Sequence, residues 1–536
     1  MAIYNLFSII IIFVNSYELF SIGCQKELTG DIPGAIEYYK RALSLDTTAF
    51  EIYYALANAH YKIQKIDQGI EFAKRGLCFS PDNLNLYTIL AVGYIGKGDL
   101  KGAINSYRDA LKYHPDNLEI YQTISILYEG IGDLKTAKEV LLEIPEEKKT
   151  SEIYTRLGTI CGRMNDHNGA IGYYQKAFTI DTTNSVALIG IGTGFDILGI
   201  KDSSIYYYEK AAQYDTSLSV SKRLIDLYID TEQYQKLINT ARPIIARDYY
   251  ENNVRRSLGF ALYKVGLLEE ALSEFLIAEG INPQDTYSKF YIGRIYLEQG
   301  RYDEAQQKLN EAIRINPDFV ELWIYSGFIA LNKRDYKTAR YAFTEAAHRN
   351  ADLAQVYYLL GVIDEMEQKY DRAYFYYRKS LSIEPKSLAS LTALANLCDR
   401  LDRKDEALAL FEKVIEIDTT DAIALNYVGY TYAERAESLD YALRLIEKAL
   451  AIEPNNGYFV DSRGWVFYQL EKYEEALADL KRANELVEDP VILEHLGDVY
   501  MKLKDFKKAV EIYKRVLELQ PDNKVVKEKI RQLEER

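Results

Sequence analysis

Residues 285–318 read DTYSKFYIGRIYLEQGRYDEAQQKLNEAIRINPD. Apolar residues recur at helical spacing on both sides of Gly300, as around Ile292 and around Leu309. Gly300 lies in a polar stretch that interrupts the pattern, and Pro317 ends it because proline does not fit inside a helix. The stretch therefore predicts two amphipathic helices joined by a tight turn.

A small residue equivalent to Gly293 returns every 33 to 35 positions along almost the whole chain, with one member missing between Gly192 and Gly259. The series is Gly23, Ala57, Ala91, Ser125, Gly158, Gly192, Gly259, Gly293, Gly327, Gly361, Ala395, Gly429, Gly464 and Gly497. A second small-residue series, which includes Ala103, Ala305 and Ala509, follows it twelve positions later. An internal period of this length indicates a repeat array, in which each unit packs only against its neighbours.

The repeat resembles the tetratricopeptide repeat (TPR), whose pattern is an aromatic or Leu at position 4, an aliphatic residue at 7, a small residue at 8 and a bulky residue at 11. It continues with Ala at 20, an aromatic or Leu at 24, Ala at 27 and Pro at 32. The third unit carries these eight positions as Tyr87, Leu90, Ala91, Tyr94, Ala103, Tyr107, Ala110 and Pro115. The resemblance implies an all-α fold, a right-handed superhelical α-solenoid of about fifteen helix-turn-helix units.

We expect an apolar N-terminal segment over 1–16, repeats one to six over 16–217, and repeats eight to fifteen over 252–522. Repeat seven, 218–251, departs from the pattern, and residues 523–536 are predicted to form a capping helix with one polar face. In repeat seven, Ile225 and Leu237 replace the two small residues, and Pro243 falls inside the second helix. Either a degenerate folded repeat or a bend of the array explains this pattern.

The N-terminal segment contains the apolar stretch 6–14, which is too short to cross a membrane but has the length of a signal-peptide core. No Lys or Arg precedes it, and a hydrophobic first helix is the alternative interpretation. Residues 20–24 also resemble a degenerate lipoprotein box ending at Cys24, although Gly23 belongs to the repeat pattern. We favour export to the periplasm or the periplasmic face of an outer membrane, with a cytoplasmic location as the alternative.

The C-terminal repeats carry a second resemblance. Residues 426–430 (NYVGY) and 454–465 (PNNGYFVDSRGW) resemble the C-terminal part of a group of bacterial TPR proteins, many of them exported and envelope-associated. The resemblance covers about 80 residues and implies a bacterial envelope context. It implies no activity.

The composition and the motifs argue against catalysis and nucleic-acid binding. The net charge is −15, whereas phosphate backbones require clustered Lys and Arg. The four cysteines form no CxxC pair, and the five histidines form no HExxH motif. The glycine-rich stretch 190–194 lies inside a predicted helix, whereas a phosphate-binding loop follows a strand. We expect no enzyme activity, no cofactor, no metal and no transmembrane segment apart from a cleaved signal.

In the TPR family, positions 2, 5, 9 and 12 of each first helix line the concave groove. The resemblance places aromatic and Arg side chains there, the types that concentrate binding energy at interfaces. In repeats eight to ten they are Arg256, Phe260, Tyr263, Tyr287, Phe290, Arg294 and Phe328, and in repeats eleven to fourteen Tyr358, Tyr430, Tyr458, Trp465 and Tyr468. Alternatively, they pack against the adjacent second helices. Some TPR proteins bind the two carboxylates of an acidic tail with a clamp of Lys, Asn and Arg side chains in the groove. This clamp is incomplete here, because Tyr54 and Thr392 stand where Lys is needed beside Asn58 and Asn396.

These observations predict a non-catalytic scaffold that binds a protein or peptide partner. Two other functions fit a repeat array. One is a regulatory or substrate-recognition array of a separately encoded enzyme such as a glycosyltransferase, and the other is a self-assembling structural array. The sequence names neither the partner nor the oligomeric state.

Overall fold

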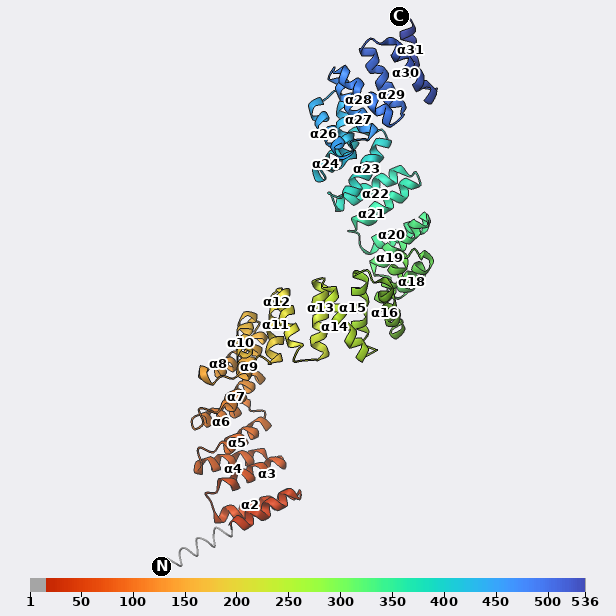
Figure 1. Ribbon diagram of the computed structural model, residues 1–536. Coiled ribbons are helices and arrows are strands. Elements are labelled where there is room, and N and C mark those ends of the chain that lie inside the picture. Colours follow the sequence, from red (N-terminus) through yellow and green to blue (C-terminus); the bar gives the residue numbers. More distant parts are fainter. Residues whose placement is uncertain (1–15, 536) are drawn as a thin grey trace, which may run out of the picture. The chain divides into compact units, whose positions relative to one another are not determined.

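The computed structural model describes residues 16–535, which fold into helical hairpins with no strand in that range. The chain divides into two compact units, 1–274 and 275–536, and helix α16 contains the boundary. Successive helices follow one another as antiparallel pairs within each unit (Figure 1). The all-α solenoid expected from the sequence is confirmed.

In the first unit, residues 16–28 form a helix that precedes the labelled ones. The helices that follow are α2 (Ile32–Leu45), α3 (Phe50–Lys62), α4 (Ile66–Phe79), α5 (Leu84–Gly96), α6 (Leu100–Leu111), α7 (Leu118–Gly130), α8 (Leu134–Leu142), the 3-10 turn η1 (Glu146–Lys148), α9 (Ser151–Arg163), α10 (His167–Ile180), α11 (Ser185–Ile197), α12 (Lys201–Ala211), α13 (Leu218–Asp230), α14 (Tyr234–Arg247) and α15 (Asn252–Lys264).

Helix α16 (Leu268–Ile281) leads into the second unit. Its further helices are α17 (Thr286–Glu298), α18 (Tyr302–Ile315), α19 (Val320–Asn332), α20 (Tyr336–Arg349), α21 (Ala354–Met366), α22 (Tyr370–Ile383), α23 (Leu388–Arg400), α24 (Lys404–Ile417), α25 (Ala422–Glu434), α26 (Leu439–Ile452), α27 (Gly457–Gln469), α28 (Tyr473–Leu486), α29 (Pro490–Lys502), α30 (Phe506–Leu519) and α31 (Lys524–Glu534).

The helices begin and turn where the sequence supplies the required local chemistry. The Asp99 side chain accepts a hydrogen bond from the Gly102 amide at the start of α6, and Asn83 does the same for Leu86 at the start of α5. These caps satisfy amides that the first helical turn leaves without partners. Between the two helices of a repeat the chain passes through the left-handed region, as at Gly300 with φ 73°. Glycine adopts that conformation at little cost.

The recurring small residue of the first helix makes room for a large side chain of the second helix. A Cβ atom added to Gly361 would lie 2.6 Å from the ring of Tyr377, and one added to Gly327 would lie 2.5 Å from the ring of Phe343. Real Cβ atoms do not approach other atoms so closely, so any larger residue forces the ring away. In these repeats, the periodic small residue therefore marks a close contact between the two helices.

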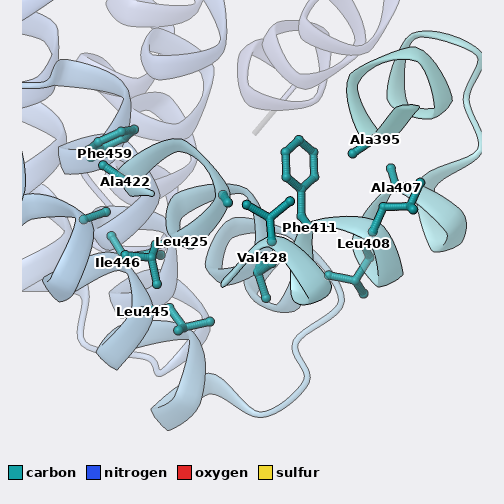
Figure 2. Close-up of a cluster of buried hydrophobic side chains, with 14 of the residues drawn as sticks. Ala395, Ala407, Leu408, Phe411, Ala422, Leu425, Val428, Leu445, Ile446 and Phe459 are labelled. Atoms are coloured by element: carbon teal, nitrogen blue, oxygen red, sulfur yellow. The ribbon is translucent and has the colours of Figure 1, made fainter. Parts of the chain in front are cut away.

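Large side chains from neighbouring repeats fill the space between the helix pairs. In one cluster of the second unit, Phe411 of α24 lies beside Val428 of α25, and Leu425 faces Ile446 of α26 (Figure 2). Phe459 of α27 belongs to the same buried cluster. Because each cluster joins consecutive repeats, the hydrophobic core is a row of local contacts along the array.

Repeat seven keeps two helices despite its unusual residues. Ile225 and Leu237 are both buried, and Pro243 lies inside α14. The division between the two compact units falls one repeat later, after Glu274. The domain boundaries and the bend at repeat seven stay predictions.

The two ends of the array differ. Residues 1–15, which carry the predicted signal-peptide core, lie outside the described residues. Cys24 is half-buried, with its sulfur 3.5 Å from the Tyr39 hydroxyl. At the other end α31 buries Val526 and Ile530 against the last repeat and so forms the expected capping helix, but Val525 points into solvent. Among residues 16–535, no helix combines the length and apolar character needed to cross a bilayer.

Candidate functional site

A groove of about 1120 Å³ lies between the first helices of repeats eleven and twelve, α21 and α23. One tyrosine from α22 completes its wall. The lining residues are Tyr358, Val362, Glu365, Met366, Tyr377, Leu388, Ala389, Thr392, Ala393, Asn396, Asp399 and Arg400. Most occupy positions that the TPR resemblance assigns to the concave surface, and Tyr358 is one of the predicted groove residues.

The charged groups of this groove have partners within the protein. Glu365 accepts a hydrogen bond of 2.8 Å from the Tyr377 hydroxyl, and its other oxygen lies 3.4 Å from Arg400 Nη1. Asp399 accepts hydrogen bonds from Lys404 at 2.6 Å and from the Tyr427 hydroxyl at 2.7 Å. The paired charges leave a groove whose recognition chemistry is mainly apolar and neutral-polar.

Asn396 is the neutral polar group at the centre of this chemistry. It is exposed, and its side chain makes no hydrogen bond to another residue in the described part of the chain. An amide offers both a donor and an acceptor, which matches the two polar groups of a peptide backbone. Apolar side chains flank it, including Met366, which is 61% exposed. The arrangement suits an extended polypeptide segment.

The junction of repeats one and two carries the same residue types as the groove between repeats eleven and twelve, at equivalent positions of the repeat. Glu27 accepts hydrogen bonds from the Tyr39 hydroxyl at 2.6 Å, from the Asn58 amide at 3.3 Å and from Lys62 at 2.7 Å. A carboxylate of the protein itself thus holds the Asn and Lys side chains here. Sequence reasoning missed this acid, although the twelve-residue spacing from Glu27 to Tyr39 recurs between Glu365 and Tyr377.

Three predicted groove aromatics of repeats thirteen and fourteen belong to one stack. The Trp465 ring lies between Tyr468, at 4.6 Å between centroids, and His495, at 4.1 Å. Tyr430 lies 6.3 Å from the His495 ring. Both faces of Trp465 are therefore covered by neighbours, whereas Tyr458, on the same helix, is largely exposed.

His495 also has a partner that sequence reasoning missed. Its Nδ1 lies 2.9 Å from Asp461 Oδ1, and both side chains are buried. The two residues come from successive repeats, so no short motif in the sequence reveals the pair. Within residues 16–535, no group of His, Cys, Asp and Glu side chains has the arrangement of a metal site.

The other predicted groove residues lie in different environments. Phe290 is 5% exposed, and its ring contacts those of Phe319 and Tyr325. Tyr325 also lies under the Arg294 guanidinium. Sequence reasoning left open whether such residues line the groove or pack, and for Phe290 the structure shows packing. The remaining members are half-buried, namely Tyr287, Arg294 and Phe328 in the second unit and Arg256, Phe260 and Tyr263 in the first.

The glycine-rich stretch 190–194 serves helix packing. A Cβ atom at Gly190 would lie 2.4 Å from the Tyr174 ring, and one at Gly192 would lie 2.8 Å from the Tyr208 ring. These glycines lie within α11 and so form no phosphate-binding turn.

Comparison with known families identifies the repeat. Models described as TPR repeat or tetratricopeptide repeat match residues 28–64, 94–158, 151–184, 293–333, 343–420 and 490–523. The matches fall in both compact units, and the chain belongs to the tetratricopeptide repeat family.

Similar proteins share only part of the chain. A TPR repeat-containing protein of Pseudomonas aeruginosa is 32% identical over 132 residues, which are 24% of this chain and 22% of that protein. A TPR repeat-containing protein of Methanocaldococcus jannaschii is 31% identical over 110 residues, 20% of this chain and 19% of that protein. The chain thus spans about a fifth of the length of these two relatives. In the crystal structure of the APC/C hetero-tetramer Cut9-Hcn1, the aligned chain has a TM-score of 0.35 and 12% identity, covering 84% of this chain and 96% of that one.

Proposed function

We propose that this protein is a non-catalytic scaffold that binds an extended peptide segment of a partner protein in the groove between α21 and α23. The observation that carries the proposal is the exposed Asn396 amide among apolar side chains, in a groove whose charges are paired internally. Hydrogen bonds between the Asn396 amide and the peptide backbone orient the peptide, and contact with the apolar walls of the groove supplies binding free energy.

The family supports the same class of function. Relatives include proteins named Superkiller complex protein 3, in Homo sapiens, and Mitochondrial import receptor subunit TOM70, in Saccharomyces cerevisiae. Those names describe a component of a complex and a receptor subunit. The matched segments are 26% and 11% of this chain, so the partners of those proteins are not transferred to it.

Affinity capture with quantitative mass spectrometry tests the proposal. We expect a Met366→Ser, Asn396→Ala double variant to lose the proteins that the wild-type chain retains. Phe375→Ser is the matched control, because Phe375 is 62% exposed, close to the 61% of Met366, but does not line the groove. The proposal is wrong if the double variant captures the same proteins in the same amounts as the control.

We also propose that the chain is exported, on the basis of the apolar stretch 6–14 and the resemblance of 426–465 to envelope-associated TPR proteins. Mass spectrometry of the mature N-terminus tests this. Cleavage near Ser16 supports export by a signal peptide, and acylation of Cys24 supports a lipoprotein. An intact Met1 contradicts export by a cleaved signal.

A further inference from the structure

The first helices of the last three repeats and the capping helix carry a row of exposed apolar side chains. These helices are α25, α27, α29 and α31, and in each of them the exposed apolar residue is the second residue of the helix. They are Ile423, Tyr458, Val491 and Val525, exposed by 63%, 52%, 50% and 60%. Single exposed apolar residues are common on protein surfaces, but neighbours in a row form a patch that needs an explanation. We call these four residues the apolar ridge.

The four helices lie side by side in a fixed register. His495, the sixth residue of α29, contacts Asp461, the fifth residue of α27, at 2.9 Å. Lys529, the sixth residue of α31, contacts Glu494, the fifth residue of α29, in the same way at 2.9 Å. Helix α25 packs against α27. The second residues of these helices therefore line up across the helix N-termini.

The same position is polar in repeats two to five of the first unit, whereas repeats one and six carry Tyr17 and Val186, exposed by 74% and 57%. Repeats two to five carry Glu51, Asn85, Glu119 and Glu152 there. Helix packing does not require an apolar residue at this position, because it faces away from the second helix. The apolar residues at this position are isolated in the first unit, whereas the four at the C-terminal end occupy consecutive helices and so form one local surface.

Carboxylates border the apolar ridge on the side of the loops that precede its helices. The loops that precede the four helices, 418–421, 453–456, 487–489 and 520–523, contain no Lys or Arg. Their acidic residues are Asp418, Asp421, Glu453, Glu488, Asp489 and Asp522. On the opposite side, one turn beyond the ridge positions, Asp461 is buried against His495 and Glu494 is paired with Lys529.

The cations around the ridge do not balance these acids. Arg515 pairs with Glu488 at 2.8 Å, and Arg482 donates to the Pro454 carbonyl at 3.0 Å. Lys529 is shared between Glu494 and Asp498, at 2.9 and 2.6 Å. Lys524 and Lys527 lie at the α31 end of the ridge. Over the first three helices, the surface next to the ridge is therefore acidic, which favours a cationic partner.

The spacing of the ridge indicates the conformation of that partner. Packed helices lie about 8–10 Å apart. A polyproline II segment has three residues per turn and a rise of about 3.1 Å per residue, so every third side chain returns to the same face after about 9 Å. One apolar side chain in three would thus meet successive ridge residues, and side chains at the positions between them would reach the acidic loops beside the ridge.

We infer that the apolar ridge binds an extended, basic segment of a partner protein with an apolar residue at every third position. Its residues lie on helices other than α21 and α23, so variants at the two sites are tested independently.

The probe is a fluorescein-labelled synthetic peptide of Leu-Pro-Lys triplets, titrated with the full-length chain and followed by fluorescence anisotropy. There are two comparison peptides. One has Glu in place of every Lys, and the other has the same composition as the Lys peptide but with the leucines placed next to one another. We expect the Lys peptide to bind more tightly than either, with an affinity that falls as salt is added.

A Tyr458→Ser, Val491→Ser variant tests the location. Both side chains are exposed, so the variant should keep its circular dichroism spectrum and melting temperature. We expect its affinity for the Lys peptide to fall by about tenfold or more. The control is Tyr341→Ser with Phe375→Ser, two exposed aromatics on second helices, and it should bind like the wild type. The groove variant at Met366 and Asn396 should also bind normally.

Three results would overturn the inference. One is no binding of the Lys peptide, or equal binding of the Glu peptide. Another is unchanged binding by the Tyr458→Ser, Val491→Ser variant. The third is a molar mass in light scattering that rises with concentration for the wild type and not for this variant, which would make the ridge an interface between copies of the chain.

Discussion

The Tyr377 ring lies against Gly361 in the core of repeat eleven, and its hydroxyl donates a hydrogen bond of 2.8 Å to Glu365 in the groove. Burial raises the pKa of Tyr377, and the Glu365 carboxylate raises it further, so the hydroxyl stays protonated and remains a donor near neutral pH. One side chain thus connects the packing of the repeat to the orientation of a groove residue.

The first prediction concerns this hydrogen bond. Tyr377→Phe keeps the buried ring and removes the donor, so we expect a loss of about 1 kcal/mol in the free energy of unfolding. Thermal melting followed by circular dichroism measures it. Tyr376→Phe is the control, because Tyr376 is half-buried and stacks on Tyr357. Equal melting temperatures for the two variants would show that the bond does not contribute.

The second prediction concerns the small residue of the second helix. Ala305 is fully buried, so Ala305→Leu should overpack the helix crossing and cost about 1–3 kcal/mol. Gln307→Leu on the exposed face should leave the melting temperature nearly unchanged. The adjacent Gln306 is unsuitable as a control, because its amide donates a hydrogen bond of 2.8 Å to the buried Ser326. A melting temperature of Ala305→Leu that matches Gln307→Leu would contradict the packing.

The third prediction concerns a buried carboxylate. Asp364 is fully buried between Arg340 and Arg372, with 3.3 Å from Arg372 Nε to its Oδ2. Asp364→Ala removes the carboxylate that both guanidinium groups share, but Arg340 keeps Glu367 as a partner and Arg372 is half-exposed. We therefore expect a loss of about 1–3 kcal/mol in the free energy of unfolding. The exposed Asp371 supplies the control variant, Asp371→Ala. Urea denaturation that shows the same midpoint for both would disprove a structural role for the network.

The fourth prediction concerns thiol reactivity and pH. Burial raises the pKa of Cys398 to about 11, and the nearby Glu406 carboxylate adds to the shift. The thiolate is the reactive form, so Cys398 should resist Ellman's reagent near neutral pH and react faster as the pH approaches 11. The exposed Cys78 should react first. Mass spectrometry assigns the sites, with Cys78→Ser as the control that removes the fast phase. Labelling of Cys398 as fast as Cys78 in the folded protein would contradict the burial.

The repeat pattern was sufficient to predict the helices and the tight contacts within each repeat. The reason is that these contacts join residues at constant separations, as from Gly361 to Tyr377, so a period in the chain reports them directly. The capping helix was predictable in the same way, from the alternation of apolar and charged residues between 523 and 536. Within this helix Val526 is buried, whereas the adjacent Val525 is 60% exposed.

By itself, the sequence determined the family and the helix pairs, because both follow from the spacing of residues along one repeat, and the family resemblance supplied the positions expected to face the groove. Only the tertiary structure decided which of those positions remain available to a partner. Phe290 is buried by aromatics of the next repeat, Trp465 is covered on both faces, and Tyr458 stays open. The physical reason is that exposure depends on side chains from adjacent repeats, whose packing no period within a single repeat describes.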